Sequence, residues 1–398
     1  MNPKTLKTAF FLACLVMNAA FSLADELKLV PHPLALEDGK AVTLNIPEGW
    51  NITLAAQGMK RPRFMAFSPD GRLFIGGLYN LSDTKKGSVY ILADFDRASG
   101  RFQKSSVYLS GLRNPNSVGF YTDAAGKQWI YIAMTDHLVR YAFHNGDSAP
   151  TGPPEILATF PAYGLNYKYG GWHLTRTICF GGNGKLYVSV GSSCDSCVER
   201  KEETRACIVE MDPDGKNQRL FASGMRNAVD IKWILGGLMA TDMGADKLGD
   251  DEPHEAIYQV KDGLDYGWPY TYNSKDGVKR DPKFTDTSAD FLAKVPEPFW
   301  TYVAHASPLG IEYFDETAPA ELKNHFLVAF HGSSKKSLGH GYKVIRMNQG
   351  EAGDDFITGF WKDGKVYARP CDILKDNKGG FFLTDDFIGV VYHLSPNS

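Results

Sequence analysis

Long apolar runs are almost absent from this chain. Outside its first two dozen residues, no segment approaches the roughly 20 consecutive apolar residues that a membrane-spanning helix needs. A large excess of charge is absent as well: the net charge is −3, and no basic stripe alternates with exposed aromatic residues as in nucleic-acid binding proteins. We therefore expect a soluble protein with no membrane span and no nucleic-acid partner.

The N-terminal segment is the exception. Lys4 and Lys7 precede an apolar stretch over 9–21, and small residues at 22 and 24 stand before Asp25. A short basic segment, an apolar segment too short to span a bilayer and small residues before a polar start are typical of a secretory signal peptide. A buried N-terminal helix is the alternative. We predict a signal peptide over 1–24, a single mature domain over 25–398 and a periplasmic or secreted protein.

Cysteine is scarce, and its number is odd once the predicted signal peptide is set aside. The five that remain are Cys179, Cys194, Cys197, Cys207 and Cys371. In an oxidising compartment at least one of these thiols has no partner within the chain. Cys194 and Cys197 form a CxxC pair without a second pair at zinc-site spacing and without the helix that a catalytic dithiol wants. We predict a small structural disulfide between them, with Cys207 as the rival partner.

A pair of short apolar strands repeats along the chain. Six times a short apolar strand meets a Gly, Asp or Asn turn, returns as a second strand and is followed by a third. The pairs begin near Met65, Ser117, Thr177, Val229, Leu309 and Cys371. Units of this size bury their faces only by packing on one another. We predict an all-β fold, a six-bladed β-propeller, closed by strands from 41–56 pairing with the blade that ends at Leu394.

Several polar and cationic residues stand just before or just after these predicted strands. They are His173, Arg176, Arg226, Asn227, Lys335, Lys336 and Arg369. In a propeller the innermost strands converge on a central channel, and loops at one end of it form the usual binding site. Fixed cations there indicate a ligand with several carboxylates or phosphates, whereas ion pairs with local acids such as Asp230 and Asp372 are the alternative. His173, among glycines at the start of a strand, has the chemistry of a general base.

The loop after the fourth strand pair is acidic. Its carboxylates are Asp242, Asp246, Asp250, Asp251, Glu252 and Glu255. Hard cations such as calcium take several oxygen ligands, often including backbone carbonyls. The spacing matches no EF-hand pattern, and a solvated acidic loop is the plain alternative.

Taken together, these segments resemble a known family. The matching runs are HLTRTICFGGNGKLYVSVGSSCDSC, FASGMRNAVDIKW, LGDDEPHEAIYQVKDGLDYGWPY, AHASPLG, FLVAFHGSSKKSLGHGYKVIRM and ARPCDILKDNKGGFFLTDDFIGVVYHL. From about Arg63 to Leu394 their order and intervals are similar to those of the soluble pyrroloquinoline quinone (PQQ)-dependent aldose and sorbosone dehydrogenases. That family is a six-bladed propeller, which agrees with the repeat count.

The resemblance implies an oxidoreductase that oxidises a sugar or an aldehyde. His173 is similar to the family's catalytic base, which takes the proton from the substrate hydroxyl while a hydride passes to C5 of the quinone. Arg226, with Asn227 beside it, is similar to the residue that polarises the C5 carbonyl, a role that suits a fixed guanidinium. Electrons would then leave to a separate acceptor, a periplasmic carrier or a quinone, because Val198 after Cys197 rules out a haem-attachment CxxCH there.

The resemblance also implies two cofactors, PQQ and Ca²⁺. Lys335 or Lys336, together with Arg369, are similar in position to the cations that hold the PQQ carboxylates. Gly244 and Ala245 resemble the pair whose backbone carbonyls bind calcium, which polarises the quinone as a Lewis acid.

Three positions depart from the family's patterns. Trp172 stands where the glucose-oxidising branch has an acidic or amide residue before its histidine, and Cys371 stands where that branch has a second arginine after Arg369. The run HGSSKK replaces the HGSWNR typical of the sorbosone type. Substrate choice is therefore not inherited, and we expect a sugar, an aldehyde or a related polyol.

Two functions of other classes use the same fold. A calcium-dependent lactonase would need acidic side chains from several blades converging on a metal, and no ring of cations. A non-catalytic propeller would bind a glycan or a peptide through exposed loops.

Overall fold

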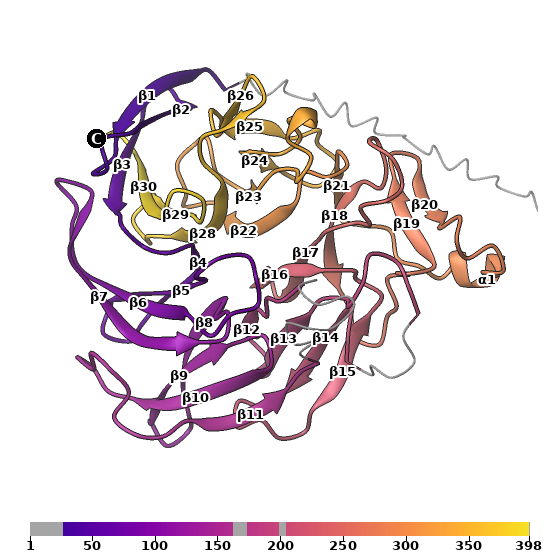
Figure 1. Cartoon of the computed structure of the whole chain (residues 1–398), viewed down its shortest axis with the longest axis horizontal. Coiled ribbons are helices and arrows are strands. Elements are labelled where there is room, and N and C mark those ends of the chain that lie inside the picture. The colour runs from indigo at the N-terminus through magenta and orange to yellow at the C-terminus, as the bar shows by residue number, and fades with distance from the viewer. Residues whose placement is uncertain (1–26, 162–172, 199–203, 398) are drawn as a thin grey trace, which may run out of the picture.

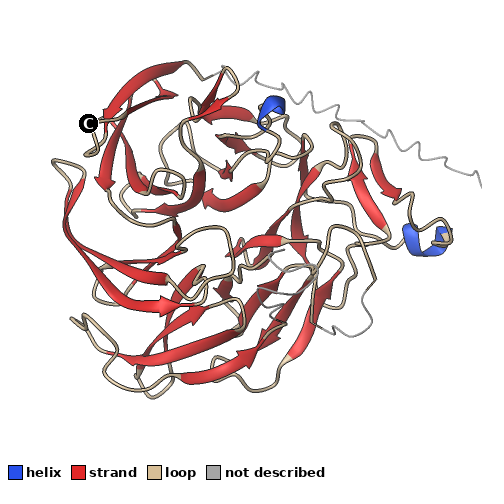
Figure 2. Ribbon diagram, viewed as in Figure 1, coloured by secondary structure: helices blue, strands red, loops and turns tan. Residues whose placement is uncertain are grey.

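The computed structural model describes residues 27–161, 173–198 and 204–397. These residues form six four-stranded antiparallel sheets that stand around a common axis as the blades of a β-propeller (Figure 1). Regular structure is almost entirely strand (Figure 2). Each of the six predicted strand pairs forms the first two strands of one blade, so the predicted fold class is confirmed.

The first three blades follow one another along the chain. Their strands are β4 (Pro62–Phe67), β5 (Leu73–Gly77), β6 (Gly87–Asp96) and β7 (Arg101–Leu112); β8 (Ser117–Thr122), β9 (Gln128–Ala133), β10 (His137–Phe143) and β11 (Glu155–Thr159); and β12 (Ile178–Phe180), β13 (Leu186–Val190), β14 (Cys207–Met211) and β15 (Arg219–Ser223).

The next three blades complete the ring. Their strands are β16 (Ala228–Ile234), β17 (Gly237–Asp242), β18 (Glu255–Val260) and β21 (Trp300–Tyr302); β22 (Pro308–Phe314), β23 (His325–Phe330), β24 (Lys343–Met347) and β25 (Asp354–Ile357); and β28 (Pro370–Lys375), β29 (Phe381–Asp385), β30 (Val390–Pro396) and β3 (Trp50–Ala56). The last blade therefore takes its outer strand from the N-terminal part of the chain.

This closure was predicted, and it is confirmed for one of the two strands in the segment 41–56. Strand β3 pairs antiparallel with β30, with Ile52 opposite Leu394. Strand β2 (Ala41–Pro47) instead pairs with β1 (Leu29–Ala35) and meets the fifth blade through a bridge between Asn45 and Thr358. This pairing covers the edge that β30 would otherwise expose and joins segments from distant parts of the chain in one sheet.

The core is divided into layers between neighbouring blades. Leu73 and Ile75 of the first blade pack on Phe382 and Val391 of the sixth, and comparable clusters fill the other five junctions of the described residues. Each inner strand thus has both faces covered, and β13 is buried along its whole length. This explains why the sequence shows continuous apolar runs rather than alternation.

Carboxylates tie the innermost strands together near the axis. Asp230 accepts a hydrogen bond from the backbone N–H of Ile311 in the next blade at 2.9 Å, and Asp372 accepts one from the N–H of Met65 at 2.8 Å. Both acids sit at bulges where the pairing register shifts. Such bulges bend the strand and re-aim the residues that precede it, and these residues line the site described below.

The remaining elements lie outside the blades. They are the hairpin β19 (Thr271–Ser274) and β20 (Gly277–Arg280), helix α1 (Ala289–Leu292), the 3₁₀ turn η1 (Lys336–Leu338), and the pair β26 (Trp361–Lys362) and β27 (Lys365–Val366). Among the described residues, no helix is long and apolar enough to cross a membrane. The predicted signal peptide and Trp172 lie outside the described ranges.

Candidate active site at the propeller axis

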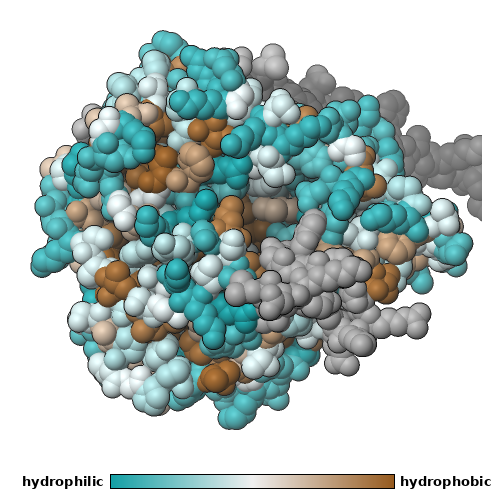
Figure 3. Space-filling model, in the orientation of Figure 1, coloured by the Kyte–Doolittle hydropathy of each residue, from teal (hydrophilic) through white to brown (hydrophobic). Residues whose placement is uncertain are grey.

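A cavity of about 480 Å³ lies at the end of the axis where the innermost strands begin. Its charged and titratable lining residues are Arg63, His173, Arg226, Asp246, Glu255, His305, His331 and Arg369. The structure thus brings His173, Arg226 and Arg369 together from three different blades. A pocket of about 360 Å³ beside Phe284 and one of about 640 Å³ beside Pro319 lie elsewhere, and neither is lined by a His or an Arg. A recess near the centre of the face is visible in Figure 3.

His173 is held as a neutral base. Its Nδ1 atom lies 2.8 Å from the carbonyl oxygen of Ser192, which can only accept, so Nδ1 carries the proton and Nε2 keeps a lone pair. Burial, together with the positive charges of Arg226 and Arg176, holds the pKa of His173 well below its usual value. The imidazole is therefore neutral at pH 7, with Nε2 unprotonated, as proton abstraction requires.

The side chains of His173 and Asn227 pack closely against a glycine. A Cβ atom at Gly191 would lie 2.5 Å from the Cβ of His173 and 2.5 Å from Oδ1 of Asn227. Only a residue without a side chain allows this approach. Asn227 is held further by its backbone N–H, which donates to Asp242 at 2.6 Å.

Arg226 is buried and held by carboxylates. Its Nη2 atom lies 2.9 Å from both Asp195 and Asp246, and its Nε donates to the carbonyl oxygen of Asp195 at 3.0 Å. Its backbone N–H donates to Asp242, whose pKa burial raises to about 7. Local ion pairing, the alternative to a cationic ring, is therefore correct for this arginine, although it also lines the cavity.

Within the described residues, the guanidinium of Arg369 bonds only neutral groups. Its Nη2 donates to the carbonyl oxygen of Ser333 at 3.1 Å and to the hydroxyl of Tyr342 at 2.9 Å, and its Nη1 lies 3.3 Å from Nδ1 of His331. In the described part of the chain no carboxylate pairs with its guanidinium. The backbone N–H of Arg369 donates to Asp385, whose pKa burial raises to about 7.

A buried acid supports this side of the cavity. Asp386 lies 2.7 Å from Nε2 of His331 and 3.1 Å from Nη1 of Arg63, and it also pairs with Arg61. Burial would raise the pKa of Asp386, but His331 and the two arginines lower it far more, so it stays ionised. Burial lowers the pKa of His331, which then accepts from Arg369 and donates to Asp386 as a neutral ring.

The predicted lysines lie outside the cavity lining. Lys335 forms an exposed ion pair with Asp250 at 2.6 Å, and Lys336 begins the turn η1. The residues that line the cavity from this loop are His331, Gly332 and Ser334. A cofactor-binding role for Lys335 or Lys336 stays a prediction.

The loop predicted to bind calcium forms one wall. Gly244 lines the cavity, and its backbone N–H donates to Glu255 at 2.9 Å. Glu255 also accepts from the N–H of Ser307 at 3.0 Å, and burial raises its pKa to about 8. Within the described residues no donor bonds the carbonyl oxygens of Gly244 and Ala245, so both are available as ligands. The same residues contain no cluster of three His, Cys, Asp or Glu side chains that could hold a metal.

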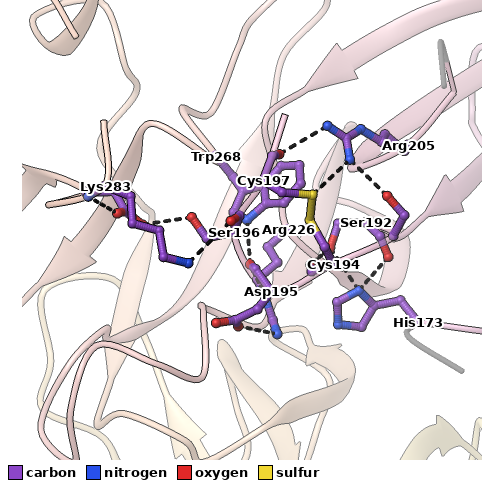
Figure 4. The surroundings of a disulfide bond; sticks show 12 residues. His173, Ser192, Cys194, Asp195, Ser196, Cys197, Arg205, Arg226, Trp268 and Lys283 are labelled. Carbon is purple, nitrogen blue, oxygen red and sulfur yellow. Dashed lines mark hydrogen bonds and ion pairs between the residues drawn. A yellow bond between two sulfur atoms is a disulfide. The ribbon is translucent and has the colours of Figure 1, made fainter. Parts of the chain in front are cut away.

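The predicted disulfide is present. Cys194 and Cys197 are bonded, whereas Cys207 is a buried free thiol, so the rival pairing is wrong (Figure 4). The Cα atoms of Cys194 and Cys197 are 6.2 Å apart, within the usual range for a disulfide. The free thiols Cys179, Cys207 and Cys371 agree with the odd count.

Five residues of the site were missed in the sequence: Arg63, Asp195, His305, His331 and Asp386. Arg226 was singled out because it stands next to a predicted strand of a strand pair, and the same criterion applies to three of them. Arg63 stands at the start of an innermost strand, and His331 and Asp386 each directly follow the second strand of a blade. Asp195 has no such signal, because it lies inside the loop that the disulfide closes.

Comparisons with known proteins agree with this architecture. A family model described as Glucose / Sorbosone dehydrogenase matches residues 59–336. The chain is similar to the holo form of the PQQ domain of pyranose dehydrogenase from Coprinopsis cinerea, at 18% identity and a TM-score of 0.67, covering 89% of this chain and 97% of that one.

Two other solved structures have the same fold. A calcium structure of a carbohydrate-active enzyme of family AA12 from Trichoderma reesei is 18% identical with a TM-score of 0.69, covering 94% of this chain and 99% of that one. The PQQ-bound form of an aldose sugar dehydrogenase from Streptomyces coelicolor is 17% identical with a TM-score of 0.59, covering 88% of this chain and 99% of that one. Since the family model spans more than half of the sequence, the chain belongs to the glucose/sorbosone dehydrogenase family.

Proposed function

We propose that this protein oxidises a sugar or an aldehyde with PQQ and calcium as cofactors. One observation carries the proposal: a neutral histidine and three arginines from different parts of the chain, Arg63, Arg226 and Arg369, line one cavity at the axis. Family membership and the PQQ-bound structures similar to this chain support it.

The cavity suits a small planar anion. Its volume of about 480 Å³ lies within the range of small-molecule sites, and PQQ carries carboxylates that guanidinium groups bind well. Arg63 and Arg226 each already pair with a carboxylate of the protein. Within the described residues, the guanidinium of Arg369 bonds only neutral acceptors. Arg369 is therefore the cation whose charge is most available to a carboxylate of the cofactor.

Bound PQQ would supply a two-electron acceptor and bound calcium a Lewis acid beside it. Nε2 of His173 takes the proton from the substrate hydroxyl, because Nδ1–H is committed to Ser192. Arg226 offers a fixed positive charge to the negative charge that develops in the cavity, at no cost of reorganisation because Asp195 already orients it. The carbonyls of Gly244 and Ala245 are the proposed calcium ligands, and Glu255 holds their loop from behind.

Substrate, acceptor and location complete the proposal. The substrate is a sugar, an aldehyde or a related polyol, and a separate periplasmic carrier or quinone takes the electrons. We propose export after removal of residues 1–24. A lactonase is disfavoured, because three arginines line the cavity and a calcium-dependent lactonase has no need for a ring of cations.

The test uses purified apo-protein with PQQ, calcium and an electron-accepting dye. We expect dye bleaching with at least one member of a panel of aldoses and aldehydes, and loss of bleaching after calcium chelation. No spectral change of added PQQ and no bleaching across the panel would overturn the proposal. Hydrolysis of a lactone panel, measured in parallel, would then identify the rival function.

A further inference from the structure

One short segment contacts both residues proposed to act on the substrate. Ser192 accepts from Nδ1 of His173 through its carbonyl oxygen at 2.8 Å and lies 3.0 Å from the same atom through its hydroxyl. The backbone N–H of Ser192 donates to the carbonyl oxygen of Arg226 at 2.8 Å. Three residues later, Asp195 contacts the guanidinium of Arg226 (Figure 4).

Asp195 accepts two hydrogen bonds from the guanidinium of Arg226. Its carbonyl oxygen accepts from Nε at 3.0 Å, and its Oδ1 accepts from Nη2 at 2.9 Å. The side chain of Asp195 is 7% exposed, whereas that of Asp246, the other acidic partner of Arg226, is 51% exposed. Asp195 is thus the buried partner, and two further donors fix it: the backbone N–H of Asp246 at 2.6 Å and the indole N–H of Trp268 at 3.0 Å.

The disulfide closes the turn that carries Asp195. Cys194 accepts from the hydroxyl of Ser192 at 2.6 Å through its carbonyl oxygen, which joins the turn to the histidine contact. Arg205 donates to the carbonyl oxygen of Cys197 at 3.1 Å. The turn lies between β13 and β14 and belongs to neither strand. Because no strand pairing restricts the backbone of this turn, the disulfide supplies a covalent restraint instead.

We propose that the disulfide-closed turn Cys194–Cys197 is a positioning element of the active site, with Asp195 as the positioning residue that sets Arg226 relative to His173. The expected effect on catalysis rests on the proposed function. The positioning of Arg226 by Asp195 does not depend on that function, since the contacts belong to the chain alone.

Variants at Asp195 separate charge from geometry. Asp195→Asn keeps a side-chain oxygen for Nη2 and the carbonyl for Nε, whereas Asp195→Ala keeps only the carbonyl. We expect Asp195→Ala to lower kcat by up to roughly 100-fold, because a displacement of about 1 Å in a reacting site has this cost, with KM little changed. Asp195→Asn restores most of kcat. It also moves the acid limb of the pH profile to lower pH, because His173 then faces a less compensated Arg226.

The double variant Cys194→Ser, Cys197→Ser tests the covalent closure with Asp195 intact. We expect the same loss of kcat and, in a crystal structure of the ligand-free variant, a displaced Asp195 and Arg226. Asp214→Asn is the control outside the turn, because Asp214 forms an exposed ion pair with Lys216 and does not line the cavity. We expect it to retain wild-type kcat.

The structural readout separates this inference from the proposed function. If the wild type binds no PQQ and oxidises no sugar, a displaced Arg226 in the double variant still supports the positioning role. An unmoved Arg226 in the crystal structure of the double variant would overturn the inference, as would wild-type kcat and pH profile in Asp195→Ala. Should the double variant fail to fold, Asp195→Ala, which keeps the disulfide, decides the question.

Discussion

The Nδ1 atom of His331 lies 3.3 Å from the guanidinium of Arg369, while Nε2 of the same ring lies 2.7 Å from Asp386. A neutral imidazole therefore connects the one cavity arginine without a described carboxylate partner to a buried, ionised acid. His331 orients the guanidinium of Arg369 without neutralising its charge, because the imidazole keeps the carboxylate of Asp386 at a distance.

Replacing His331 should weaken quinone binding. His331→Phe fills the ring volume but removes both hydrogen bonds, so we expect the affinity of the apo-protein for PQQ to fall roughly 10-fold, the cost of one lost hydrogen bond to a charged group. Absorbance titration with PQQ measures it. His325→Phe, at the opposite end of β23, is the control and should bind as the wild type does. Unchanged affinity in His331→Phe would show that Arg369 needs no such support.

Replacing His173 should affect chemistry rather than binding. His173→Ala removes the proposed base, and we expect kcat to fall by about 10²–10⁴-fold. PQQ binding by the same titration should stay near the wild-type value. Lost quinone binding with the chemical step intact would contradict the assignment of His173 as base.

The pH profile should report the same histidine. Burial and the neighbouring arginines lower the pKa of His173 below its usual value, and the neutral ring is the active form. Protonation of His173 should therefore lower the kcat/KM of the wild type only as the pH drops through a midpoint below about 6.5. Steady-state kinetics from acid to neutral pH measure it. A midpoint above that value would contradict the assignment.

Asp386 should contribute to stability in a pH-dependent way. Its pKa in the folded protein is lowered, so its stabilising effect is present above the unfolded value of about 3.9 and is lost as the pH falls through the folded value. Asp386→Asn leaves Arg63 buried without its carboxylate, and we expect a loss of about 3–5 kcal/mol at pH 7. Denaturant unfolding measures this loss. Asp214→Asn, which removes a surface pair with Lys216, is the control and should unfold as the wild type does.

Adding one methyl group at Gly191 should disturb the site without a change of charge. The new Cβ would lie 2.5 Å from both His173 and Asn227, so one of them must move, and we expect kcat to fall by roughly 10- to 100-fold. Gly237→Ala is the control, because the nearest atom to its Cβ is 3.6 Å away in Gln259. Wild-type kinetics in Gly191→Ala would show that the position of His173 is less constrained than the structure indicates.

The inner strands of every blade were predictable from the sequence. Each blade buries both faces of its first strands, and such strands have continuous apolar sequences. The outer strands were not predictable, apart from β3, which was expected from the segment 41–56. Strand β7 is exposed along most of its length and β11 has a single buried residue, so neither carries a hydrophobic pattern. The hairpin of β19 and β20 was missed because it packs outside the blades.

Local sequence determined which residues reach the axis: a residue just before an innermost strand, such as His173 or Arg226, faces the cavity because every blade begins there. Tertiary structure alone decided which charges meet. Arg63 and Asp386 are 323 residues apart and His331 and Asp386 are 55 apart, and Lys335 pairs with Asp250 at the surface instead of lining the cavity. Pairwise Coulomb energies depend on distance and burial, and neither is defined before the ring of blades has closed.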